Sequence, residues 1–178
     1  MLNHPLPDII LAILFASGDP IAYADLSDKL GVSMSELMSA VRKLRESLKN
    51  TPLMLLETEN SIKLVTKPEY AEYIRKFQSS RSQRLSEAAL EVLAIVVYKQ
   101  PVTKAEIDKI RDANSEKAIS TLVKGELIKE VCRLREPGSP AMYGITDKCL
   151  HYFGVRSYED LHGIIKHHFN ELAEAIET

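Results

Sequence analysis

Residues 99–107 read Lys-Gln-Pro-Val-Thr-Lys-Ala-Glu-Ile, and they match residues 18–26, Gly-Asp-Pro-Ile-Ala-Tyr-Ala-Asp-Leu, at a constant offset of 81 positions. The proline, acidic and aliphatic positions coincide, and Val41 and Leu122 fall in register further along at the same offset. Each stretch follows an apolar run and precedes segments with helical and strand-like patterns. A repeat with this period indicates two similar small domains that arose by duplication.

The first copy contains the elements of a winged helix. An apolar run over residues 9–15 predicts a helix, and helices over 25–30 and 33–50 follow it. Residues 53–57 and 61–66 are strand-like runs, and the three polar residues between them are typical of a hairpin turn. Three helices followed by a hairpin predict a winged helix for this half of the chain.

The second copy repeats this order. Its predicted segments are a helix over 86–98, a helix over 103–111, a helix over 115–124, a strand over 127–134, a turn over 135–140, a strand over 142–145 and a helix over 147–153. Ser33 with Glu36, and Thr103 with Glu106, have the capping-box spacing that marks a helix start in each copy. The predicted class is mainly α with small β hairpins (α+β), arranged as two tandem winged-helix domains.

A further helix and a polar segment lie between the two copies. Residues 68–77 predict a helix with one apolar face, and we expect this face, formed by Tyr70, Tyr73, Ile74 and Phe77, to pack on its own domain or on the next. The Ser-rich stretch after it predicts a linker. The predicted boundaries are an N-terminal winged-helix domain over 1–78, a linker over 79–85, a C-terminal winged-helix domain over 86–160 and a C-terminal helical tail over 161–178.

The composition is typical of a globular protein and excludes some classes of function. Of the 178 residues, 45% are hydrophobic and 27% are charged, with a formal net charge of −2. No apolar run approaches the roughly 20 residues that cross a bilayer. The N-terminus has no secretory-signal pattern. We therefore expect a cytoplasmic protein with no membrane partner.

The motifs that carry catalysis are missing from the sequence. It contains neither the glycine patterns that bind nucleotide phosphates nor the GxSxG turn of serine hydrolases. Cys132 and Cys149 lack the spacing of zinc ligands. We expect a protein that is not an enzyme, with no catalytic residue, no cofactor and no metal site.

Several stretches resemble one bacterial family, segregation and condensation protein B. They are residues 85–101 (Leu-Ser-Glu-Ala-Ala-Leu-Glu-Val-Leu-Ala-Ile-Val-Val-Tyr-Lys-Gln-Pro), 105–107, 110–111 with Asn114, 136–138, 143–147, and Leu-Phe-Ala-Ser-Gly-Asp-Pro at 14–20. The resemblance covers about residues 6 to 161. The chain departs from the family pattern at Asp112 and Ala113, where a Gly-Val pair is usual, and at Ser139, where the wing often carries Arg.

The resemblance implies an accessory subunit of condensin-like chromosome complexes. It implies homodimerisation through the N-terminal domain, and binding to the kleisin subunit, segregation and condensation protein A, which bridges the SMC ATPase heads. The implied function is that of a non-catalytic scaffold in chromosome condensation and partition during cell division. The implied location is the cytoplasm, in association with the nucleoid.

Two helices supply most of the candidate binding residues. Residues 9–15 and 92–98 are apolar all round, so each helix is either buried on two sides by its own chain or covered by a partner. The candidate dimer-interface residues, given the implied dimer, are Ile9, Ile10, Ile13, Leu14 and Phe15. The candidate partner-binding residues are Val96, Tyr98, Pro101, Pro137, Gly138 and Tyr143.

The alternative function is that of a winged-helix transcriptional regulator that binds DNA. The candidate residues for weak DNA contact are Arg42, Lys43, Arg45 and Lys49, in the third helix of the first copy. They lie in its later turns, whereas base-reading residues usually lie near the N-terminal end of a recognition helix. Strongly salt-dependent DNA binding takes about 6–10 phosphate contacts, so we expect DNA binding to be weak or indirect.

Overall fold

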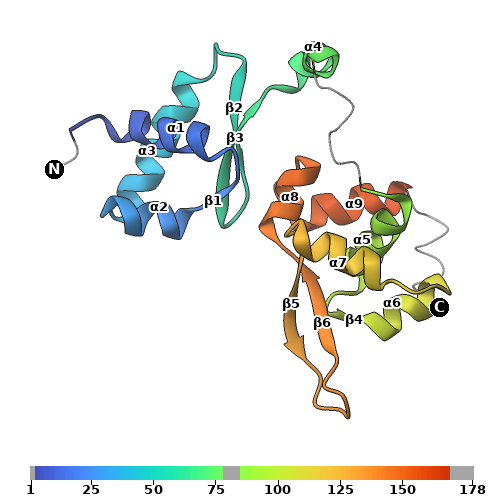
Figure 1. The fold of residues 1–178 in the computed structure, drawn as a ribbon. Coiled ribbons are helices and arrows are strands. Elements are labelled where there is room, and N and C mark those ends of the chain that lie inside the picture. The colour runs from blue at the N-terminus through green and yellow to red at the C-terminus, as the bar shows by residue number, and fades with distance from the viewer. Residues whose placement is uncertain (1–2, 78–84, 169–178) are drawn as a thin grey trace. The chain divides into compact units, whose positions relative to one another are not determined.

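The computed structural model describes residues 3–77 and 85–168 (Figure 1). The chain divides into two compact units, Met1–Ser82 and Gln83–Thr178, and each unit has its own hydrophobic core. Most of the predicted linker and the last ten residues of the predicted tail lie outside the described residues. The two units are described separately below.

The first unit packs helices against one small sheet. Its elements are α1 (Leu6–Ser17), β1 (Ile21–Ala22), α2 (Tyr23–Leu30), α3 (Met34–Ser47), β2 (Leu53–Glu57), β3 (Ser61–Thr66), the 3-10 helix η1 (Pro68–Tyr70) and α4 (Ala71–Phe77). The antiparallel sheet has the order β1-β3-β2, with Leu53 opposite Thr66 and Glu57 opposite Ile62. Side chains from α1, α2, α3 and the sheet form the core.

The second unit has the same plan with two added helices. Its elements are α5 (Glu87–Lys99), β4 (Val102–Thr103), α6 (Lys104–Arg111), α7 (Glu116–Lys124), β5 (Ile128–Arg133), β6 (Ala141–Ile145), α8 (Asp147–Phe153) and α9 (Tyr158–His168). The antiparallel sheet has the order β4-β6-β5. Ile128 lies opposite Ile145, and a bulge shifts the register between Glu130 and Cys132. Helix α5 supplies the centre of the core.

The duplication is visible element by element. Strands β1 and β4, and helices α2 and α6, have bounds that differ by the same 81 positions as the sequence repeat. In both sheets the short first strand pairs with the last strand of the hairpin. The hydrophobic pattern did not predict these two-residue strands, because they are too short to show an alternation. The α+β class is confirmed, and the element order is consistent with the predicted winged helices.

Local signals in the sequence place the helix starts. Both predicted capping boxes are confirmed: the hydroxyls of Ser33 and Thr103 accept hydrogen bonds from the backbone N–H groups of Glu36 and Glu106, at 3.3 Å in each case. In return, each glutamate carboxylate accepts from the backbone N–H of its serine or threonine, at 2.9 Å and 2.8 Å. These reciprocal bonds satisfy N–H groups that a helix start leaves unpaired.

Among the described residues, four helices end on a residue with positive φ, and Gly18 and Asp112 are two of these residues. Gly18 ends α1 with φ 65° and donates its N–H to the Leu14 carbonyl. Asp112 ends α6 with φ 49°, at one of the two positions where the family pattern usually has Gly-Val. Aspartate is one of the few residues besides glycine that adopt this left-handed conformation as single residues. The departure from the family pattern therefore preserves the end of the helix.

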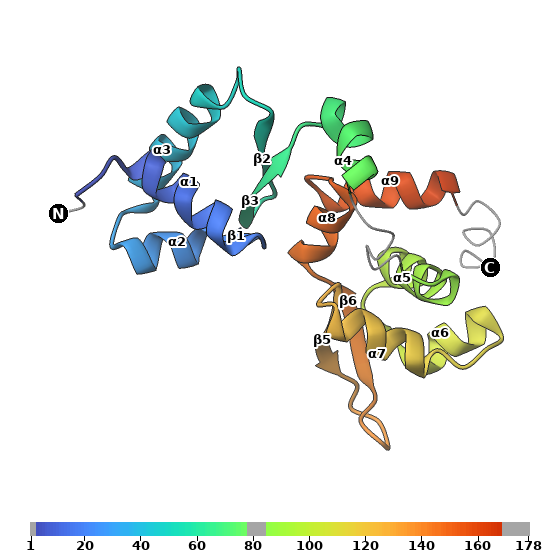
Figure 2. The same ribbon diagram turned by 45° about the horizontal axis from the view of Figure 1, so that its top comes forward.

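The apolar face of α4 does not pack on the core of its own unit, which was one of the two predicted possibilities. On this face, Tyr73 and Phe77 are 63% and 90% exposed. The chain is held elsewhere as it leaves β3: the Lys67 N–H donates to the Pro52 carbonyl at 2.9 Å, and its amine donates to the Lys49 carbonyl at 2.6 Å. In both ribbon views α4 stands apart from α1 (Figures 1 and 2).

Helix α9 belongs to the core of the second unit. It begins at Tyr158, whose hydroxyl donates a hydrogen bond to the carbonyl of Val97 on α5. Leu161 and Ile165 are buried in the core that is centred on α5. The predicted helical tail therefore starts within a helix that is already packed on this unit.

Candidate partner-binding surfaces

The predicted dimer residues on α1 have different environments. Ile10 and Leu14 are buried in the core of the first unit, and Ile9 and Ile13 are half-buried. Phe15 is 77% exposed. Within the first unit, only Phe15 of this set presents most of its side chain to an incoming partner.

The exposed face of α1 is a continuous stripe along the helix. We call it the α1 stripe, and its residues, at helical spacing, are Asp8, Ala12, Phe15 and Ala16. Ala12 and Ala16 lie on either side of Phe15 along the stripe. They were not among the predicted interface residues, because alanine carries no hydrophobic signal strong enough to separate an exposed from a buried face.

The matching face of α5 is fully buried. At the offset of the repeat, the counterparts of the α1 stripe are Ala89, Leu93, Val96 and Val97, each with at most 1% of its surface exposed. Helix α5 packs on α6, α7, β6 and α9, whereas the main contacts of α1 are with α3 and β3. Helix α9 has no counterpart on α1. The second unit thus buries a face of α5 whose counterpart on α1 is exposed in the first unit.

The two apolar helices differ in whether their own unit buries them on two sides or leaves one face for a partner. Helix α5 is buried on two sides by its own unit, and Val96 is part of the core. Helix α1 has no such cover within the first unit. An apolar helix face without cover is typical of an interaction surface.

The other predicted partner-binding residues divide between exposed and half-buried positions. Pro101, Pro137 and Gly138 are exposed, and the last two lie in the turn between β5 and β6. Tyr98 and Tyr143 are half-buried and pack against the core of the second unit. Of the predicted partner-binding residues, Pro101 before β4 and the turn residues Pro137 and Gly138 are therefore the ones exposed at the surface.

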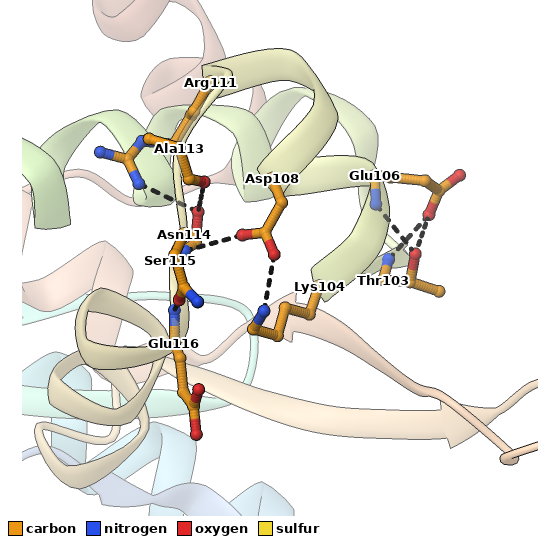
Figure 3. Close-up of polar contacts among 9 residues, drawn as sticks. All are labelled: Thr103, Lys104, Glu106, Asp108, Arg111, Ala113, Asn114, Ser115 and Glu116. Atoms are coloured by element: carbon orange, nitrogen blue, oxygen red, sulfur yellow. Dashed lines mark hydrogen bonds and ion pairs between the residues drawn. The ribbon is translucent and has the colours of Figure 1, made fainter.

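A polar network joins α6 to the start of α7 (Figure 3). The Arg111 guanidinium donates to the hydroxyl of Ser115 at 2.9 Å and forms an ion pair with Glu91 of α5, also at 2.9 Å. Asp108 accepts from the backbone N–H of Ser115 at 2.7 Å, and Asn114 accepts from the N–H of Glu116 at 2.9 Å. The motif residues Arg111 and Asn114 thus fix the turn between two helices.

The electrostatics of this network are those of a structural support. A hydrogen bond from Lys104, at 2.6 Å, is the main cause that holds the pKa of Asp108 below its usual value, and the hydrogen bonds from Ser115 add to it. Each charged group therefore has a partner of opposite charge or a donor. Such an arrangement orients the helices and leaves no proton poised for transfer.

The segment around Gly144 connects strand β6 to the side chain of Gln100. The Gln100 side-chain carbonyl accepts from the N–H of Ile145 at 2.8 Å. A Cβ at Gly144 would lie 3.1 Å from that same carbonyl oxygen and 3.1 Å from a methyl group of Val131. Glycine is needed here because the side chain of Gln100 reaches the strand. Arg111, Asn114 and Gly144, three of the residues that carry the family resemblance, therefore have structural roles.

The basic residues of α3, and Lys49 just after its end, are only partly available to a phosphate. Arg45 forms a two-pronged ion pair with Glu57, with distances of 2.7 Å and 2.9 Å to its two oxygens, and Glu57 also accepts from the Tyr23 hydroxyl at 3.0 Å. Lys49 pairs with Glu46. Arg42 and Lys43 are exposed. Two of the four predicted DNA contacts are thus already engaged with carboxylates.

The described residues contain no group of three or more His, Cys, Asp or Glu side chains placed to hold a metal ion. Cys132 is exposed and Cys149 is buried. Burial raises the pKa of the Cys149 thiol to about 12, which keeps it protonated and unreactive at neutral pH. None of the helices in the described ranges is long and apolar enough to span a bilayer.

Comparison with known sequences gives one family. The model of the family described as segregation and condensation complex subunit ScpB matches residues 8–164. Segregation and condensation protein B of Clostridium botulinum (strain Kyoto / Type A2) is 40% identical over 154 residues, which cover 85% of this chain and 80% of that protein. Its namesake from Geobacillus thermodenitrificans (strain NG80-2) is 40% identical over 162 residues, covering 89% and 78%.

Solved structures of the same description are also similar. ScpB from Mycobacterium tuberculosis has 24% identity and a TM-score of 0.40, with 84% of this chain and 95% of that chain covered. A structure described as a dimer of the ScpB N-terminal domain complexed with ScpA peptide has 28% identity and a TM-score of 0.39, covering 42% and 95%. Because these TM-scores are low, the family relation rests on the sequence matches.

Proposed function

Since this chain belongs to the family of the segregation and condensation complex subunit ScpB, we propose that it is a non-catalytic scaffold of a chromosome condensation complex. In this proposal it dimerises through α1 and binds the ScpA subunit, the kleisin, and through it the SMC ATPase. The observation that carries the proposal is the exposed α1 stripe, whose counterpart on α5 is buried in the second unit.

The free energy gained by burying Phe15 alone is too small to hold a dimer together. Burying one phenylalanine side chain contributes about 1.5–3 kcal/mol, and in a symmetric dimer Phe15 is buried twice. Association costs about 4–15 kcal/mol in lost translational and rotational freedom. The half-buried Ile9 and Ile13 flank the stripe and add apolar area. A stable dimer therefore needs further surface besides the stripe itself.

Charge introduction on the stripe tests the dimer. The variant Phe15→Glu places a carboxylate at the centre of the proposed interface, where it would be desolvated without a partner. We expect a single-chain mass by light scattering and an unchanged circular dichroism spectrum, because Phe15 is mostly exposed in the unit itself. Lys29→Glu, on exposed α2 surface, is the matched control and keeps the mass of the unmodified chain. An unchanged mass for Phe15→Glu would refute this interface.

Binding to ScpA is proposed to use the exposed residues of the second unit. Pro101 and the turn residues Pro137 and Gly138 are the predicted contacts that reach the surface. We expect the chain to co-purify with the ScpA of the same genome, and Pro137→Glu to weaken this retention. Arg156→Glu, which changes an exposed residue outside this region, serves as the control. Absence of co-purification by the unmodified chain would contradict the partner assignment.

We further propose that any contact with DNA is weak and independent of sequence. It would use Arg42 and Lys43, since Arg45 and Lys49 are paired with carboxylates. So few phosphate contacts give little affinity at physiological salt. We expect gel retardation of genomic fragments at low salt to vanish by about 150 mM salt. Retardation that survives this concentration would instead favour a transcriptional regulator.

A further inference from the structure

The first unit carries a second uncovered apolar surface, on the segment that follows its hairpin. We call residues 68–77, which form η1 and α4, the arm. Its stripe has the spacing of one helix face and consists of Tyr70, Tyr73, Ile74 and Phe77. None of these side chains belongs to the core of the first unit. Phe77, at 90% exposure, is the most exposed of the large hydrophobic side chains in the described ranges.

The length of the arm makes a cover necessary. Helix α4 has seven residues, whereas isolated helices shorter than about 12–15 residues are marginal in water. Helical stability in proteins comes mainly from packing an apolar face. The charged residues of α4 form an exposed Glu72–Lys76 ion pair, which contributes little at a surface. The stripe must therefore pack against something for the helix to persist.

The second unit shows what a helix placed after the hairpin does in this fold. There the chain continues from β6 into α8 and α9, and α9 returns to cover α5. The Tyr158 hydroxyl bonds the Val97 carbonyl within the covered face. The first unit has an exposed face, the α1 stripe, where the second unit has a buried one, and its chain continues after the hairpin into a helix of its own, α4. Helices α1 and α4 stand apart within the unit (Figures 1 and 2).

We propose that the arm of one copy packs across the α1 stripe of a second copy, and that the second arm returns the contact. This inference rests on the proposed dimer and specifies how it is built. An exchange of one identical element between two copies is a closed, twofold-symmetric arrangement. It satisfies both apolar surfaces of each copy at once and supplies the area that Phe15 alone lacks.

The shapes and charges of the two surfaces are complementary. On the α1 stripe, the side chains on both sides of Phe15 are small, because they are Ala12 and Ala16. The arm presents large aromatic side chains. Asp8 stands at one end of the stripe, and the last turn of α4 carries Arg75 and Lys76. Large side chains on the arm facing small ones on the stripe, and basic groups facing an acidic one, favour a specific fit.

The exposed aromatic side chains supply most of the area that a stable dimer buries. Aromatic side chains bury about 150–250 Å² each, and four of them per copy, Phe15, Tyr70, Tyr73 and Phe77, are at least one-third exposed. Scaled by those exposures and counted for two copies, they amount to on the order of 1,000 Å². Stable interfaces bury about 1,200–2,000 Å², and the backbone and aliphatic groups around the aromatics make up the difference.

Cross-linking between differently tagged copies tests the exchange. One chain carries Ala12→Cys or Ala16→Cys, the other carries Phe77→Cys, and both carry Cys132→Ser to remove the exposed native thiol. A short bis-maleimide should give a band that contains both tags. The control pairs the same α1 cysteine with Ser39→Cys, an exposed residue of α3, and should give no such band.

The outcomes distinguish this inference from the dimer itself. A dimeric mass without the mixed-tag band would overturn the arm exchange and leave the dimer. A link within one chain that carries both cysteines, insensitive to mixing with a second tag, shows that the arm closes on its own unit and also overturns it. A single-chain mass for the unmodified protein removes both proposals.

A second measurement does not depend on cysteine placement. The double variant Tyr73→Glu/Phe77→Glu puts charge on the arm stripe, and we expect the dimer dissociation constant to rise at least tenfold, as for other interface anchors. Glu69→Gln/Glu72→Gln changes charged residues of the arm outside the stripe and should leave the constant within about threefold. The arm lies outside the core of the unit, so both variants should fold. Equal dissociation constants for the two variants would contradict the exchange.

Discussion

Arg111 is the residue that ties the first three helices of the second unit together. It lies at the end of α6, pairs with Glu91 of α5 and donates to Ser115 at the start of α7. Its side chain is only 9% exposed, against 34% for Glu91. Removing one member of such a pair leaves the other charge without its partner in a partly desolvated site.

We therefore expect Arg111→Ala to lower the free energy of unfolding by about 2–3 kcal/mol, somewhat less than the roughly 3–5 kcal/mol for fully buried pairs, because Glu91 retains some solvent. Urea unfolding followed by circular dichroism measures this difference. Lys109→Ala, two residues away on the exposed side of α6, should change stability by no more than about 0.5 kcal/mol. Equal effects of the two substitutions would refute a structural role for Arg111.

Gly144 gives a second prediction for a single residue. A methyl group there must displace the Gln100 carbonyl and a methyl of Val131, each 3.1 Å away. We expect Gly144→Ala to destabilise the second unit by about 1–3 kcal/mol, the usual cost of overpacking. In Gly163→Ala the added methyl group meets nothing within 4 Å, and its higher helix propensity should stabilise α9 by up to about 1 kcal/mol. Thermal unfolding of both variants should give shifts of opposite sign.

Among the elements, the helix starts were predictable and the helix environments were not. Capping boxes use residues three apart in the sequence, so Ser33–Glu36 and Thr103–Glu106 could be found by spacing alone. Whether an all-apolar helix is covered by its own chain depends on contacts across the fold. Helices α1 and α5 have similar sequences in this respect, yet within its own unit α5 packs on four elements, whereas the main contacts of α1 are with two. The exposed alanines of the α1 stripe left no signal in the sequence.

The capping boxes predict how stability depends on pH. Hydrogen bonds from the backbone and hydroxyl of Thr103 lower the pKa of Glu106 in the folded state. The box therefore stabilises the fold when Glu106 is ionised, above its unfolded pKa, and this contribution is lost as the pH falls through the folded pKa. We expect Glu106→Gln to lose less stability on acidification than the unmodified chain. Glu59→Gln, at the exposed hairpin turn, should follow the unmodified chain.

For the whole molecule, the repeat in the sequence predicted most of the architecture. A constant offset of 81 positions led to two units with the same element order, and the structure has it. The predicted boundary at residue 160 did not anticipate that α9 spans it, because an amphipathic helix near a chain end has the same pattern whether it packs or extends. The α1 stripe is distinguished as a surface by its exposure, since the matching residues of α5 are buried.

The two copies of the repeat differ in how far they bury their first helix. The second unit buries its central helix with α9, while the first unit leaves the α1 stripe and the arm uncovered. A single copy with two uncovered apolar surfaces is expected to associate, since exposed patches of this kind are typical of interaction sites. The proposed scaffold function depends on this association.

The most direct test is the mass of the unmodified 178-residue chain in solution, measured by light scattering over the micromolar concentration range. We expect a mass near twice the 20.0 kDa of one chain, at physiological salt and without added partner. A mass that stays at 20.0 kDa across that range would contradict it.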